Sequence, residues 1–299
     1  MEVLMKKQME FDLLKNLKQA LLAAAKEQGR ILTEKDFGSI RWKGSEKEEF
    51  YLLDYLNNLF EIPSSNIMLG TGVEAVRSSA AMIFNLLGQK RFSYNETDFL
   101  APEYETEIKA IKDEKDTSHN AHLDATFYSS DKSEFYAVEA KMMEWLNAPK
   151  NLSPAYLNED MYLPQNVKAD IFIEFFKSLV HDQKDKDGRL LHKTQRYDAI
   201  QMAIHILAIY NHFCAEKTSV KKVVLQNIVW KYDCDDYKIE ETEAKEFVEK
   251  ANKVFMPLFK ELNIDFAVEY ATFQEAKSKI DFSNDKEREK YLARYDISR

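Results

Sequence analysis

A change in the spacing of apolar residues near the middle of the chain constrains the fold more than any other feature. Up to residue 88 the apolar side chains recur every three or four positions, whereas residues 104–112, 122–129 and 135–143 alternate between apolar and polar side chains. The first spacing is typical of amphipathic helices and the second of half-buried strands. Residues 129–133 form a short polar turn, so we predict that the second and third strands pair as an antiparallel hairpin.

Further helices and strands are predicted on both sides of this three-strand segment. Ser45 and Glu48 have the spacing of a capping box at the start of one helix. The predicted helices are 1–32, 45–60, 73–88, 167–181, 194–214, 242–262 and a charged tail from 284, and the remaining strands are 220–232 and 264–273.

Mixed helices and strands around one core predict a fold of the α/β (α+β) class, with a mixed central sheet flanked by helices. We expect a single domain over residues 1–299. It comprises an N-terminal helical extension (1–72), a core (73–232) that contains an insertion (145–193), and a C-terminal helix-strand-helix segment (233–299). Within the insertion, residues 182–189 are predicted to form a charged loop.

Composition narrows the class of protein. Hydrophobic residues make up 45% of the 299 residues, which supplies a full core, but no run of eighteen apolar residues predicts a membrane span. The start of the chain does not resemble a signal peptide, and Cys214 and Cys234 do not indicate a disulfide framework. We therefore expect a cytoplasmic protein. Its net charge of -9 argues against non-specific coating of nucleic acid, although it permits a local basic groove.

The strand at 135–143 carries the residues most suggestive of chemistry. Glu139 and Lys141 are two positions apart, so they point to the same face of the strand, and Asp124 lies on its predicted partner strand. Two carboxylates can bind a hard cation such as Mg²⁺, and a lysine can orient an attacking water or stabilise developing charge. The alternative is that Glu139 and Lys141 form the exposed edge of an amphipathic strand.

Asp124, followed after a hairpin by Glu139-Ala140-Lys141, resembles the motif of the PD-(D/E)xK, or restriction-endonuclease-like, nuclease superfamily. The core of that superfamily is helix, three strands, helix, strand, and residues 73–232 are predicted in that order. Leu123 replaces the usual proline before the aspartate. Residues 76–88 also resemble an Arg-Ser-Ser helix of uncharacterised bacterial members. The resemblance implies hydrolysis of nucleic acid, with DNA favoured, in which Asp124 and Glu139 hold Mg²⁺ (or Mn²⁺) and Lys141 assists catalysis.

The resemblance also implies supporting residues on the two core helices. Many members carry a glutamate on the first core helix, for which Glu74 is the candidate; the alternative is a solvated residue or a salt bridge to Arg77. Glu103 and Glu105 compete for the same role.

On the helix at 194–214, a polar stripe lies on an otherwise apolar surface. It contains Tyr197, Gln201, His205 and His212. Members of the superfamily often place a glutamine or lysine from this helix beside the active site, so Gln201 is the candidate and His205 the next. The alternative is that both are hydrogen-bonded core residues.

Other functions are also compatible with the sequence. One is a binding or scaffold protein that keeps the nuclease fold without hydrolysis, and another is a metal-dependent phosphoryl enzyme acting on a small nucleotide. A homodimer is compatible with the sequence as well. His119 and His122 lack the further ligands of a zinc site. Trp145, Asn147 and Lys150 follow the motif strand and could contact substrate, although a surface loop is the alternative. The basic residues that could meet phosphates are Lys184, Lys186, Arg189, Lys221 and Lys222, although solvated loop charge is the default.

Overall fold

A five-stranded mixed sheet forms the centre of the structure, a computed structural model that describes residues 79–88, 90–112, 120–142, 149–215, 218–231 and 234–296. The strands lie in the order β3-β4-β5-β8-β9. Their bounds are Glu103–Lys109 (β3), Asn120–Tyr128 (β4), Glu134–Lys141 (β5), Lys222–Val229 (β8) and Asp265–Thr272 (β9). β4 is antiparallel to both of its neighbours, whereas β5, β8 and β9 are parallel. The predicted mixed α/β class is confirmed.

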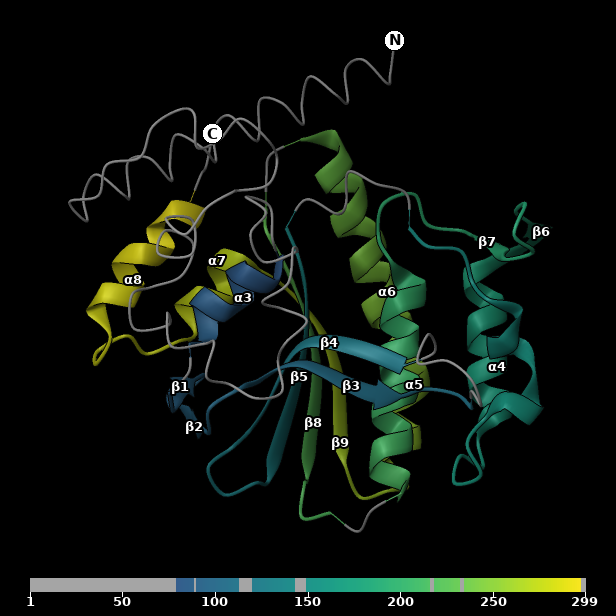
Figure 1. Cartoon of the computed structure of the whole chain (residues 1–299), viewed down its shortest axis with the longest axis horizontal. Helices are drawn as coiled ribbons and strands as arrows, with labels where there is room; N and C mark the ends of the chain where they lie inside the picture. The colour runs from purple at the N-terminus through teal and green to yellow at the C-terminus, as the bar shows by residue number, and fades with distance from the viewer. Residues whose placement is uncertain are drawn as a thin grey trace, which may run out of the picture.

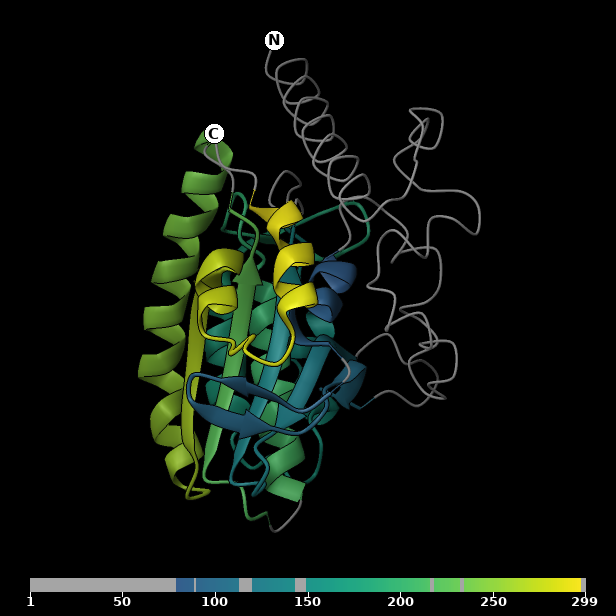
Figure 2. The same cartoon turned by 90° about the vertical axis from the view of Figure 1, so that its left-hand side faces the viewer.

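Helices cover both faces of this sheet (Figures 1 and 2). One face carries α3 (Ser79–Leu87), α7 (Phe273–Ser278) and α8 (Lys286–Leu292), and the other carries α5 (Ala199–Ala215) and α6 (Asp235–Lys260). α4 (Ala169–Leu179) packs against the outer side of α5. Successive side chains of β5 point to opposite faces of the sheet, so the strand contributes to the core on each side. Val138 belongs to the core under α3, and Ala137 belongs to the core under α5.

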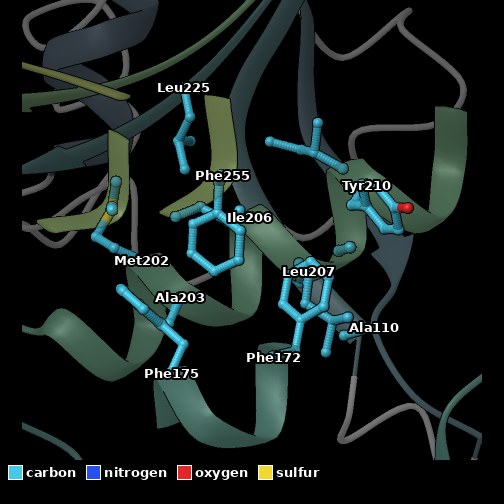
Figure 3. Close-up of a cluster of buried hydrophobic side chains, with 14 of the residues drawn as sticks. Ala110, Phe172, Phe175, Met202, Ala203, Ile206, Leu207, Tyr210, Leu225 and Phe255 are labelled. Carbon is cyan, nitrogen blue, oxygen red and sulfur yellow. The ribbon is translucent and has the colours of Figure 1, made fainter. Parts of the chain in front are cut away.

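The larger core lies between α4, α5, α6 and the sheet (Figure 3). Phe172 and Phe175 of α4 meet Phe255 of α6, while Met202 and Ile206 of α5 contribute to the same cluster. This packing holds α5 against the sheet, which is the arrangement that positions the candidate site.

The predicted hairpin is confirmed, with Ala125 opposite Val138 and Tyr128 opposite Phe135. The other predicted strands also form, each within three residues of its predicted bounds. Helix α6 begins at Asp235, earlier than predicted, and continues through Pro257. Helix α5 begins at Ala199 rather than 194. The predicted helices 1–32 and 45–60, and the start of 73–88, lie outside the described residues.

Several short elements were not predicted. A hairpin of β1 (Phe92–Tyr94) and β2 (Thr97–Phe99) precedes the main sheet, and a second hairpin joins β6 (Val180–Lys184) to β7 (Leu190–His192). The prediction of a charged loop over 182–189 was therefore wrong for residues 182–184. The exposed side chains of β6 hide the strand pattern, while Gly188, at φ +78°, forms the turn.

The short 3₁₀ helices are Pro154–Leu157, Glu159–Met161 and Ala293–Tyr295. Across the described ranges, no helix combines the length and apolarity needed to cross a membrane.

Candidate active site

The regular alternation of side chains along β4 is interrupted at Asp124. Leu123 packs in the core under α5, whereas Ala125, two residues later, packs in the core under α3. A regular strand would place both side chains on one face. The pairing on either side puts Glu105 of β3 level with Asp124, and Glu105 has a φ of +52°. Positive φ is uncommon outside glycine and is often found at functional sites.

The side chain of Asp124 takes the place of a backbone hydrogen bond between β4 and β5. The regular pairing of these strands ends at Ala125 and Val138. Beyond that point, the backbone N–H of Ala140 donates to Asp124 Oδ2 over 2.6 Å. Asp124 is therefore anchored directly beside the Glu139–Ala140 backbone, on the partner strand from which the sequence predicted it to approach.

Glu139 is the centre of a network that joins β5 to α5. Its carboxylate is 3% exposed, and Lys141 Nζ and Gln201 Nε2 donate to Oε1 over 2.6 and 2.8 Å. His205 Nε2 lies 3.0 Å from Oε2, and Lys141 Nζ also donates to Gln201 Oε1 over 2.8 Å. The structure thus brings together Glu139, Lys141, Gln201 and His205. The alternative of an exposed strand edge does not hold for Glu139.

The charged groups of the site alter one another's pKa values. Burial opposes ionisation of Glu139, but Lys141 and His205 outweigh it and lower the pKa of this carboxyl to about 2. Burial and the negative charge of Glu139 raise the pKa of Asp124 well above its ordinary value. The pKa of Glu105 is also raised, first by burial and then by Glu139 and Glu107. The ionised Glu139 carboxylate therefore disfavours ionisation of the two other carboxyl groups, those of Asp124 and Glu105.

A divalent cation fits the chemistry of this region. Carboxylate oxygens are the ligands that Mg²⁺ prefers, and a cation held by Asp124 and Glu139 would weaken the repulsion that disfavours ionisation of Asp124. Asp124 accepts the Ala140 backbone N–H through Oδ2, so a metal ligand from this side chain would be Oδ1. The arrangement is not a closed metal cage: no three Asp, Glu, His or Cys side chains of the described segments converge on one point.

Helix α6 fixes the start of α5, which carries Gln201 and His205. The carboxylate of Glu243 accepts hydrogen bonds from the three successive backbone N–H groups of residues 195–197, over 2.6 to 3.0 Å. Arg196 Nε also lies 2.6 Å from Asp236 Oδ1. These contacts hold residues 195–197 outside the helix, which explains its late start. They also tie the segment just before α5, the helix that carries Gln201, to α6.

Sequence reasoning missed a second buried carboxyl group, that of Glu240 on α6. It is 2% exposed, and Tyr270 Oη donates to its Oε2 over 2.9 Å. The spacing to Ala244, Phe247 and Ala251, at four, seven and eleven positions, places Glu240 on the buried stripe of the helix. That spacing was the signal available in the sequence.

Burial raises the pKa of Glu240 to about 8. Folded Glu240 keeps its proton up to that pH, whereas the unfolded chain releases it near 4.5. Unfolding between these values releases a proton, so this group makes the protein less stable as pH rises from about 4.5 to 8. Glu240→Gln stays neutral and keeps an acceptor for Tyr270. We expect its melting temperature to match that of the wild type near pH 4, below the pKa of the unfolded carboxyl, and to exceed it near pH 9.

The control is Glu246→Gln, which changes an exposed glutamate of the same helix. Thermal denaturation of the three proteins across this pH range tests the expectation. The expectation would be contradicted if the melting temperatures of Glu240→Gln and the wild type differed by the same amount at both ends of the pH range.

The other predicted residues lie apart from the network or outside the described residues. Glu74, His119, Trp145 and Asn147 lie outside them. Of the two competitors on β3, Glu105 lies level with Asp124, whereas Glu103 is exposed at the other side of Tyr104. His122 Nδ1 lies 3.5 Å from Glu107 on the partly exposed surface, and His212 packs against Phe213.

Comparison with known proteins does not assign the site. No protein-family model, curated protein or solved structure matches the chain. Its chemistry must therefore be inferred from its own residues.

Proposed function

We propose that this protein is a metal-dependent phosphodiesterase that hydrolyses nucleic acid, with DNA the favoured substrate, and that its core is of the PD-(D/E)xK type. The observation that carries the proposal is the meeting of Asp124, Glu139 and Lys141, from two adjacent strands, with Gln201 of α5. The element order supports it, because α3, the strands β3 to β5, α5 and β8 follow the order helix, three strands, helix, strand, with β1 and β2 added after α3 and with α4, β6 and β7 inserted between β5 and α5.

Each residue has a chemical role in this proposal. Asp124 and Glu139 would hold Mg²⁺ or Mn²⁺, with Glu105 as a further acidic neighbour. When bound, the ion would polarise the phosphodiester and lower the pKa of an attacking water. Lys141 orients that water and stabilises negative charge as it develops. Gln201 holds the ammonium group of Lys141 in place, and His205 fixes the orientation of the Glu139 carboxylate.

The test is cleavage of a panel of single- and double-stranded DNA and RNA by the full chain. We expect cleavage with Mg²⁺ or Mn²⁺, none with EDTA, and a loss of about a hundredfold or more in Glu139→Gln. The matched control is Glu246→Gln, which should cleave as the wild type does. Absence of cleavage of every substrate with either metal would refute the proposal.

A scaffold protein without hydrolysis is the second candidate, and one observation favours it. Both oxygens of Glu139 already have protein partners, which compete with a metal. Calorimetric titration with Mn²⁺ separates the two. A nuclease should bind Mn²⁺, and Asp124→Asn and Glu139→Gln should each weaken that binding. A scaffold should release no heat of binding in any of the three proteins.

A further inference from the structure

A cavity of about 290 Å³ lies beside the candidate active site. Gln201 and His205, which hold Glu139, form part of its wall, so the cavity adjoins the proposed catalytic carboxylate. Ile200 and Ile204 of the same helix supply an apolar surface. The volume lies near the lower end of the range of about 300–1,000 Å³ typical of ligand pockets, which suits a single small organic unit.

The charge of this cavity is opposite to that of the whole protein. Lys150, Arg189 and His122 line it, while no Asp or Glu is among its described lining residues, although the chain carries a net charge of -9. Lys150 and Arg189 are exposed. The positive charge of Arg189 already helps to lower the pKa of Asp185, although the carboxylate of Asp185 accepts its side-chain hydrogen bond from Asn151. His122 contributes less because it already lies beside Glu107. Two exposed cations beside an apolar wall favour a ligand that has both an anionic and an apolar part.

Hydrogen bonds fix the two chain segments that carry Lys150 and Arg189. Leu152 pairs with Leu190 through two backbone hydrogen bonds of 2.9 Å, which joins the segment after Lys150 to β7. Asn151 Nδ2 donates to Asp185 Oδ2 over 2.8 Å, and Asp185 Oδ1 accepts the backbone N–H of Arg189 over 2.9 Å. In this antiparallel pairing Arg189 is level with Ser153 and Lys150 is level with His192, so the two basic residues are fixed on one wall of the cavity, three residue positions apart along it.

We propose that this basic cavity binds one nucleotide unit next to the bond that is cleaved. Its phosphate lies against Lys150 and Arg189, and its sugar or base lies against Ile200 and Ile204. The inference rests on the proposed function for the identity of the reaction, but phosphate binding at the cavity can be measured without cleavage. Contacts of this kind position a strand without reading its sequence.

The test is the binding of a short, fluorescently labelled single-stranded DNA, measured by anisotropy in EDTA so that no metal-dependent cleavage occurs. We expect Arg189→Glu and Lys150→Glu each to raise Kd about tenfold or more. Each should also reduce the slope of log Kd against log salt concentration by about one. The matched control is Lys186→Glu, an exposed lysine of the same hairpin that is not among the lining residues, and its Kd should change less than about twofold. Melting temperatures should be unchanged, because all three side chains are exposed.

Competition with an unlabelled nucleoside monophosphate identifies the source of the phosphate. Tighter binding of the strand than of the monophosphate supports a nucleic-acid subsite. If the strand and the monophosphate bind equally well, and Arg189→Glu loses both, the cavity binds phosphate but its ligand is a free nucleotide. The inference is overturned if the wild type binds neither ligand or if the two cavity variants bind as well as the control. In that case the proposed nuclease activity would still stand if cleavage depended on Glu139. Conversely, binding at the cavity without any cleavage would refute the proposed nuclease activity and leave the binding site in place.

Discussion

Lys141→Met is expected to lower the rate of metal-dependent cleavage by about a hundredfold to ten thousandfold. Lys141 is the cation of the proposed site, and its Nζ lies 2.6 Å from Glu139 Oε1 and 2.8 Å from Gln201 Oε1. Methionine keeps much of the side-chain length but cannot orient a water or stabilise negative charge. The measurement is the single-turnover cleavage rate of the best substrate of the panel, at saturating metal.

The matched control is Lys222→Met. Lys222 is also a strand lysine paired with a glutamate, 2.8 Å from Glu134, but it lies at the opposite end of the β5–β8 pairing. It should lose its ion pair and keep the cleavage rate. Thermal denaturation of both variants shows whether lost activity reflects lost folding. A folded Lys141→Met protein that cleaves within about threefold of the wild type would exclude the proposed role of Lys141.

Phe255→Ala is expected to lower the free energy of unfolding by about 3–5 kcal/mol. Phe255 is fully buried, and its ring centroid lies 5.0 Å from that of Phe172 and 4.7 Å from that of Phe175. Removing the ring leaves a cavity where α4, α5 and α6 meet (Figure 3), and rigid neighbours cannot fill it completely. Urea denaturation measures the change in the free energy of unfolding.

Met256→Ala is the control, because the next residue of the same helix is 49% exposed. It removes a side chain of similar size and should cost less than about 1 kcal/mol. Equal losses in the two variants would show that the α4–α5–α6 core does not carry the stability assigned to it.

The central hairpin was predictable because its information is local. Alternation along two strands and a five-residue polar turn place Asp124 on the strand next to Glu139 without knowledge of the rest of the chain. Period two also puts Glu139 and Lys141 on one face. The short hairpin β1–β2 and the helix α7 escaped prediction because elements of three to six residues have too few positions to show a period.

The sequence by itself thus determined the class of fold, the hairpin and the shared face of Glu139 and Lys141. Tertiary structure decided which groups surround that face. Glu105 comes level with Asp124 only through the pairing of β3 with β4, and Gln201 reaches Glu139 from 62 residues away through the packing of α5 on β5. Glu240 is buried only because α6 covers the sheet. Strand periodicity is a property of neighbouring residues, whereas the surroundings of a carboxyl group depend on which distant surfaces are packed against it.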